Sequence, residues 1–287
     1  MFKNRLKYLF LLAAFVPFGC GSLCVAVAQV AVADDPRPEG GVYLIGMGPG
    51  APDLLTIKAR NILKKADRVY CFDFLEHEVA RFVGSDALTV ASPLLRGKHH
   101  MSDLGGLEGE KRKRALKSIA ESERFVRHVQ KLVAQGKTVA IAAAGDPTIF
   151  CPWSWVMGEL GGSNFSVVPG LSSFNAANAA LEQSITTKGG AVLISSGQHL
   201  GTADENGRLA MTLVFFTHRT KIDQLIERLL DRYRPDTPLA IVAEASYAGE
   251  QVIHSTLGKI TKMLETRQLP KLYLLYVGDA LQKRPDD

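Results

Sequence analysis

The sequence predicts an α/β protein of two domains, mainly from the order of its apolar runs. Residues 42–45 form a short apolar run typical of a buried strand, and a glycine-rich turn follows at 46–50. Residues 54–66 then carry apolar side chains at helical spacing, and residues 68–72 predict a second strand. A strand, turn, helix and strand in this order are typical of a parallel sheet.

The rest of the first half continues this pattern. Residues 105–135 are charged and lack proline, which predicts one or two exposed helices. Strands are expected at 139–143 and 165–168, and Ser172 and Ser173 are candidates to cap a helix at 174–181.

A second series of strands and helices begins near Gly190. The predicted strands are 191–195, 212–216, 239–243 and 272–277, and the predicted helices are 222–230 and 260–264. A hairpin arm at 250–253 indicates a mixed sheet rather than a purely parallel one. We place an N-terminal α/β domain at 42–168 and a C-terminal α/β domain at 169–287.

The first 33 residues have the pattern of a targeting segment. A basic start precedes an apolar run at 8–16, and small residues at 31–33 suit a signal peptidase. These features predict a signal peptide at 1–33, a linker at 34–41, and export to the periplasm. An uncleaved membrane anchor is the alternative, because no charged residue occurs between Lys7 and Asp34.

Charge and cysteine content exclude some classes of protein. The net charge is +5, but Lys3, Arg5 and Lys7 lie in the leader, and +2 remains without them. This excess is too small to indicate a nucleic-acid partner. Beyond the leader only Cys71 and Cys151 remain, and two buried thiols are favoured over a disulfide.

The turn at 46–51 fits the G-x-G-x-x-A pattern of dinucleotide-binding proteins. Asp67 lies where a ribose-binding carboxylate is expected, so a nicotinamide-dependent oxidoreductase is one hypothesis. However, Pro49 and Pro52 each remove a backbone N–H donor that a pyrophosphate needs. The turn therefore favours close backbone approach to a ligand without a phosphate cradle.

Two further turns of this kind follow predicted strands, at 144–147 and 169–172. The carboxyl ends of parallel strands meet at one edge of a sheet, so we expect the three turns to converge on one ligand.

These segments, taken in order, resemble the motifs of the tetrapyrrole methylases. The opening motif corresponds to residues 42–56, the central Gly-Asp-Pro motif to 145–150, the third to 167–174, and the C-terminal block to 238–257. The resemblance covers roughly residues 41–280 and leans toward the cobalamin branch.

The resemblance implies two α/β domains with a cofactor cleft between them. It implies an S-adenosylmethionine-dependent C-methyltransferase that acts on a precorrin-like or porphyrinoid tetrapyrrole, and a homodimer. Carried over by motif, the cofactor-binding residues are Pro49, Ala144, Gly145, Asp146, Ile149, Ser172, Ser173, Thr217, Ala245 and Ser246. Thr217 stands where a methionine is often found in the family.

Asp73 and Lys98 are the catalytic candidates that the resemblance suggests. Relatives carry an aspartate after the second strand, but ungapped alignment places Phe72 there and Asp73 one residue later. Lys98 follows Gly97, as in a family Gly-Lys pair. Arg60 and Arg96 suit a substrate with many carboxylates. His99 and His100 are expected in a solvated loop, and no metal site is predicted.

Other functions remain open at this stage. An exported tetrapyrrole-binding protein without catalysis is the alternative, because S-adenosylmethionine is made in the cytoplasm and the leader predicts export. A methylase of RNA or of a protein side chain is a third hypothesis, which the modest charge disfavours for RNA.

Overall fold

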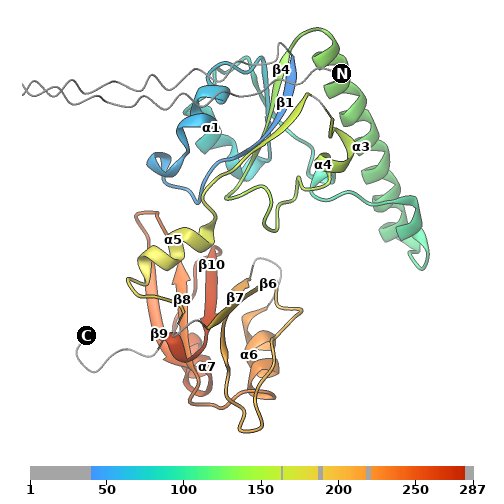
Figure 1. Cartoon of the computed structure of the whole chain (residues 1–287). Coiled ribbons are helices and arrows are strands. Elements are labelled where there is room, and N and C mark those ends of the chain that lie inside the picture. The colour runs from blue at the N-terminus through green and yellow to red at the C-terminus, as the bar shows by residue number, and fades with distance from the viewer. Residues whose placement is uncertain (1–39, 163, 187–189, 218–220, 282–287) are drawn as a thin grey trace, which may run out of the picture. The chain divides into compact units, whose positions relative to one another are not determined.

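The computed structural model describes residues 40–162, 164–186, 190–217 and 221–281. The predicted signal peptide at 1–33 and nearly all of the linker therefore lie outside the described residues. The described part contains two five-stranded sheets, each with helices, which is the predicted α/β class (Figure 1).

The first sheet is parallel, with strand order β3-β2-β4-β1-β5. Its strands are β1 (Gly41–Gly46), β2 (Arg68–Cys71), β3 (Leu88–Val90), β4 (Thr138–Ala143) and β5 (Phe165–Val168). Both central strands, β1 and β4, are buried along their whole length. This explains why their sequences are continuous apolar runs rather than alternating ones.

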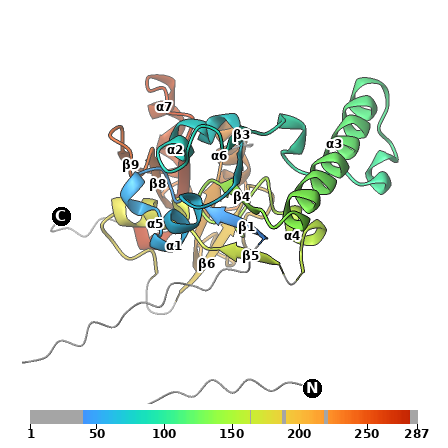
Figure 2. The same cartoon turned by 90° about the horizontal axis from the view of Figure 1, so that it is seen from above.

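Helices cover both faces of this sheet. They are α1 (Ile57–Leu63), α2 (Glu76–Ala80), α3 (Gly109–Ala134) and α4 (Val156–Glu159). Successive residues of β1 point to opposite faces, so Leu44 packs with Val129 of α3 while Ile45 packs with Leu63 of α1. Figures 1 and 2 show α1 and α3 on opposite sides of β1 and β4.

The second sheet is mixed, with strand order β6-β7-β10-β8-β9. Its strands are β6 (Ala191–Ser195), β7 (Met211–Phe216), β8 (Pro238–Ala243), β9 (Gln251–Thr256) and β10 (Tyr273–Val277). Only β6 and β7 pair in parallel among these neighbours. The predicted hairpin arm is β9, which runs antiparallel to β8.

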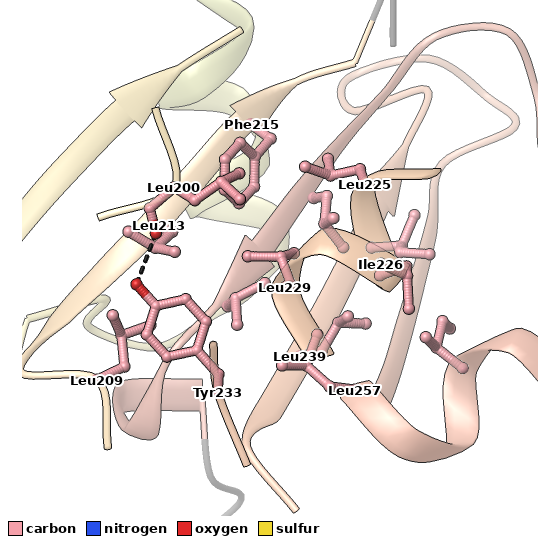
Figure 3. Close-up of a cluster of buried hydrophobic side chains, with 14 of the residues drawn as sticks. Leu200, Leu209, Leu213, Phe215, Leu225, Ile226, Leu229, Tyr233, Leu239 and Leu257 are labelled. Carbon is pink, nitrogen blue, oxygen red and sulfur yellow. Dashed lines mark hydrogen bonds between the residues drawn. The ribbon is translucent and has the colours of Figure 1, made fainter. Parts of the chain in front are cut away.

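Three helices pack on the second sheet, α5 (Ser173–Ala180), α6 (Ile222–Leu230) and α7 (Leu257–Glu265). Leu225 of α6 and Ile260 of α7 belong to the core on one face, and Ala177 of α5 to the core on the other. Within the first of these cores, the Tyr233 hydroxyl donates a hydrogen bond of 2.6 Å to the carbonyl of Leu200 (Figure 3).

The structure differs from the sequence-based prediction in the short elements. The helix expected at 54–66 divides into a 3-10 turn, Pro52–Leu54, and α1, because the Thr56 hydroxyl caps the Ala59 N–H at 3.2 Å. Strand β3 and helix α2 were not predicted. They have three and five residues, too few to show a periodic pattern.

The first sheet ends at Val168 and the second begins at Ala191, with α5 packed on the second sheet. The domain boundary at 168/169 stays a prediction. Across the described ranges, no helix combines the length and the apolar character that a membrane span needs.

We predict that Tyr233→Phe destabilises the protein by about 1–3 kcal/mol, because it leaves the buried Leu200 carbonyl without its donor. Urea denaturation measures this change. Thr266→Ala is the matched control, since that hydroxyl also bonds a backbone carbonyl, of Met263 at 3.2 Å, but in an exposed position. Equal stability of Tyr233→Phe and the wild type would contradict the prediction.

Candidate active site

The three glycine turns touch one another through their backbones. They follow β1, β4 and β5, which are neighbours in the sheet, so their carboxyl ends lie side by side. The Gly145 N–H donates to the Gly48 carbonyl at 2.8 Å. A Cβ added to Gly170 would lie 2.3 Å from the Gly145 oxygen and 2.8 Å from the Gly46 Cα. Only glycine allows this approach.

The β8–β9 loop and the end of strand β7 also contact these segments of the first sheet. The Ala51 N–H donates to Ser246 Oγ at 3.3 Å. A Cβ on Gly50 would lie 2.1 Å from Cζ of Tyr247, so this ring rests directly on the Gly50 backbone. Farther along, the rings of Phe150 and Phe216 lie 5.0 Å apart. The end of β7 and the segment after β8 are therefore brought to the segments that follow β1 and β4.

Backbone strain gathers in the same place. In the described ranges four residues other than glycine have a positive φ, and three of them are Phe150 (+50°), Glu244 (+50°) and Ser246 (+72°). Side chains disfavour this conformation, which the surrounding structure must enforce. Strain of this kind concentrates at functional sites, so it supports a ligand site here.

Several predicted cofactor residues already have partners within the chain. Buried Ser172 caps α5, and its Oγ accepts from the Phe174 N–H at 3.3 Å. The Oγ1 of buried Thr217 donates to the Tyr273 carbonyl at 2.7 Å. Asp146 Oδ1 accepts from the Thr148 N–H at 2.7 Å and from its hydroxyl at 2.5 Å.

The predicted cofactor-binding residues differ in polarity and in how far they are exposed to solvent. Ala144 is exposed, whereas seven others are half-buried: Pro49, Gly145, Asp146, Ile149, Ser173, Ala245 and Ser246. Gly145 adopts φ +63°, and an added Cβ there would come no nearer than 3.7 Å to Ser172 or Ser173. Open glycine backbone beside apolar and hydroxyl side chains fits a cofactor with a nucleoside, a sulfonium group and an amino acid.

Of the catalytic candidates, Asp73 follows β2, the strand beside β4, whereas Lys98 lies in the loop after β3. Asp73 forms an ion pair with Arg96 and accepts a hydrogen bond from the Phe74 N–H at 2.9 Å. Lys98 forms an ion pair with Glu159, which was not among the predicted site residues. The Gly97 N–H donates to the Pro152 carbonyl at 3.1 Å, which ties this loop to the segment after Asp146.

Three aromatic residues at these contacts were not among the predicted site residues: Tyr247, Phe150 and Phe216. Nothing in their local sequence pattern separates these aromatic residues from core residues. Their contacts with the turns depend on the tertiary fold.

Asp67 lies at the opposite edge of the first sheet, immediately before β2 begins. Its carboxylate accepts from the Thr138 N–H at 2.8 Å and from Lys137 Nζ at 3.0 Å. The backbone hydrogen bond is the main cause that lowers the pKa of Asp67, and Lys137 adds to it. Because the glycine turns are at the other edge, Asp67 does not serve as their ribose ligand.

The two described cysteines are buried and free, as favoured from the sequence. They belong to the cores on opposite faces of the first sheet. Burial raises the pKa of each thiol to about 11. His99 and His100 are exposed, as expected for a solvated loop.

The protein-family model of the Tetrapyrrole (Corrin/Porphyrin) Methylases matches residues 41–261 of the sequence. The chain belongs to this family. Two precorrin-4 C(11)-methyltransferases of Mycobacterium tuberculosis are each 30% identical over 84% of this chain and 91% of their own length.

Solved structures show the same fold. A cobalt precorrin-4 methyltransferase, described as a cobalamin biosynthetic enzyme, aligns with TM-score 0.63 and 22% identity, covering 84% of this chain and 96% of that one. Uroporphyrin-III C-methyltransferase of Thermus thermophilus, complexed with S-adenyl homocysteine, aligns with TM-score 0.60 and 23% identity, covering 85% and 94%.

Membership of the tetrapyrrole methylases confirms the predicted family, the two-domain α/β fold, the methyltransferase activity and the cofactor, S-adenosylmethionine. The oxidoreductase hypothesis is therefore wrong, and the non-catalytic alternative is disfavoured.

The predicted localisation, an exported protein in the periplasm or anchored to a membrane, is wrong. It depended on the composition of residues 1–33 alone, whereas the matches over 84% or more of the chain are to biosynthetic tetrapyrrole methyltransferases. A basic start before an apolar run is a local pattern with little information, and the relationship over the whole fold outweighs it.

We predict that Gly170→Ala weakens binding of S-adenosylhomocysteine at least about tenfold, because the new methyl group forces the turns apart and small misplacements in a site are costly. Isothermal titration calorimetry measures the affinity. Gly84→Ala is the matched control, because a Cβ there meets nothing within 4 Å. Unchanged affinity in Gly170→Ala would show that the contact of the turns does not shape the pocket.

Proposed function

We propose that this tetrapyrrole methylase transfers a methyl group to a ring carbon of a precorrin-4-type tetrapyrrole. The observation that carries this proposal is the match to precorrin-4 C(11)-methyltransferases along almost their full length. The geometry supports it, since the three turns, the β8–β9 loop and the end of β7 come together at one edge of the first sheet.

We further propose that the cofactor is held by the residues carried over from the family motifs. Pro49 and Ile149 supply apolar contacts, while Ala144, Gly145 and Asp146 present backbone groups after β4. Both bonds from Thr148 use Oδ1 of Asp146, which leaves Oδ2 to accept from an amino or hydroxyl group of the cofactor. Ser172, Ser173, Thr217, Ala245 and Ser246 complete the pocket from the other turns.

S-adenosylmethionine supplies an electrophilic methyl group. The chain contributes alignment, because a ring carbon held in line with that methyl group reacts far faster than one in solution. Asp73 is proposed as the base that accepts the proton released when the methyl group is added, so that the macrocycle gains a methyl cation and loses one proton. Lys98 is proposed as the acid of an internal proton shift, in which it donates one proton to the macrocycle and takes another back without net change. In the free protein both side chains are held by ion pairs, with Arg96 and Glu159 respectively.

A direct assay tests the activity. The purified chain is incubated with S-adenosylmethionine and either enzymatically prepared precorrin-4 or uroporphyrinogen III, and products are analysed by mass spectrometry. The proposal predicts that precorrin-4 gains the mass of one methylene group. Methylation of uroporphyrinogen III alone would reassign the substrate, and no methylation of either would refute the proposal.

We predict that Asp146→Ala lowers the affinity for S-adenosylhomocysteine about tenfold, through loss of the turn and of the Oδ2 acceptor. Calorimetry again provides the measurement. The matched control is Asp204→Ala, because Asp204 Oδ1 accepts two backbone N–H bonds, from Asn206 at 2.9 Å and Arg208 at 2.8 Å, in an exposed turn of the second half. Equal losses in both variants would count against a cofactor role for Asp146.

A homodimer is the second part of the proposal. It is supported by the resemblance to the family and by exposed Val167 and Leu171, which lie on and just after the edge strand β5. Light scattering after size exclusion should give twice the chain mass of 31.2 kDa. Val167→Lys should shift the mass toward one chain, and a monomeric wild type would exclude the dimer.

A further inference from the structure

The guanidinium of Arg96 lies over two aromatic rings. Its Cζ is 5.2 Å from the ring centroid of Phe72 and 5.1 Å from that of Phe74. The two rings are themselves stacked, with centroids 6.0 Å apart. A planar cation on aromatic faces keeps its orientation, so Arg96 presents its N–H donors in a fixed plane.

The base of this platform is rigid. Phe72 is fully buried, and its ring stacks on that of Trp153 with centroids 4.3 Å apart and planes 11° apart. Phe74, by contrast, is 51% exposed. The guanidinium of Arg96 is therefore held against a buried aromatic ring, while its N–H donors remain at the surface.

The partner that Arg96 has in the free protein is easily replaced. The side chains of Arg96 and Asp73 are 36% and 65% exposed. Exposed ion pairs contribute little stability, because water screens the charges and both side chains lose freedom. Asp73 Oδ1 also keeps its hydrogen bond from the Phe74 N–H, so the carboxylate stays in place without Arg96.

Its ion pair with Asp73 holds Arg96 near the carboxyl end of β2. Asp73 and Phe74 follow β2, the neighbour of β4 in the sheet. The loop around Arg96 is tied to the segment after Asp146, because Trp155 Nε1 donates to the Leu95 carbonyl at 3.0 Å. An anchoring role for Arg96 requires that a macrocycle bound beside the β4 turn extends one carboxylate substituent to this loop.

We propose that Arg96 is the anchor for one substrate carboxylate, and that it exchanges Asp73 for that carboxylate when the tetrapyrrole binds. Two parallel N–H···O bonds suit the guanidinium fork and a carboxylate. The exchange frees the Asp73 carboxylate at the moment when the substrate arrives, which couples binding to the availability of the base. The inference rests on the proposed function for the class of substrate.

Lys98 is less suited to this exchange. Its side chain is only 13% exposed in its ion pair with Glu159, and an ammonium lacks the planar fork. The structure therefore separates the two cations by role, with Arg96 as the exchangeable one.

Porphyrin binding tests the anchor. Quenching of tryptophan fluorescence reports binding, since Trp153 stacks on Phe72. Uroporphyrin III is compared with a water-soluble porphyrin whose side groups are neutral. Arg96→Gln should bind uroporphyrin III about tenfold more weakly than the wild type does, and its affinity for the neutral porphyrin should be unchanged.

Arg127→Gln is the control variant, because Arg127 forms an exposed ion pair with Glu123 at 3.7 Å on α3. Equal affinity of Arg96→Gln and wild type for uroporphyrin III would overturn the proposal.

Asp73→Asn distinguishes exchange from a structural role. Under exchange, removal of the competing carboxylate should tighten uroporphyrin III binding up to about fivefold, while methylation becomes slower. A structural ion pair would instead make both binding and methylation weaker, and that outcome would refute the exchange.

Calorimetry with S-adenosylhomocysteine separates this inference from the proposed function. A wild type that binds S-adenosylhomocysteine but not uroporphyrin III would overturn both the anchor and the carboxylate-bearing substrate class. A wild type that methylates its substrate while Arg96→Gln keeps full affinity would overturn the anchor alone.

Discussion

The contact among Gly46, Gly145 and Gly170 is the constraint on which the site depends. Three adjacent parallel strands end at this point, and their turns approach so closely that a single Cβ would meet backbone atoms at 2.3–2.6 Å. Backbone atoms cannot move aside as a flexible side chain can. The contact therefore sets where the segments that follow each turn begin, including Pro49, Asp146 and Ser172. It explains why glycine occupies positions 46 and 170, whereas Gly145 is favoured by its positive φ of +63°.

The elements that position the site were predictable because their signals are local. Strands β1 and β4 are buried on both faces, so each is an unbroken apolar run that ends at a glycine turn. Helix α5 starts at its Ser172 cap, which the sequence indicates directly. By contrast, β3 has half-exposed residues at an edge of the sheet, and its three residues carry no such signal.

Contacts between distant segments could not be predicted in this way. Asp73 and Arg96 are 23 positions apart, and Lys98 and Glu159 are 61 apart. Each pair forms because the fold places two distant segments together, and the residue types alone do not identify the partner.

The predicted leader shows a different error, in which a clear local pattern was given too much weight. Its composition was clear, but a compositional pattern in one short segment says little about the function of the fold that follows.

The second half of the chain completes the site through a loop that is itself strained. Glu244 and Ser246 adopt positive φ where β8 turns toward β9, and this conformation accompanies the bond between Ser246 Oγ and the Ala51 N–H. Tyr247 then rests on Gly50, which has φ +143° and no side chain to obstruct the ring. The glycine at position 50 and the strained backbone of the β8–β9 loop thus both contribute to the same contact. Because the proposed cofactor residues Ala245 and Ser246 lie in this loop, its contact with the first turn would order both halves of the proposed pocket together.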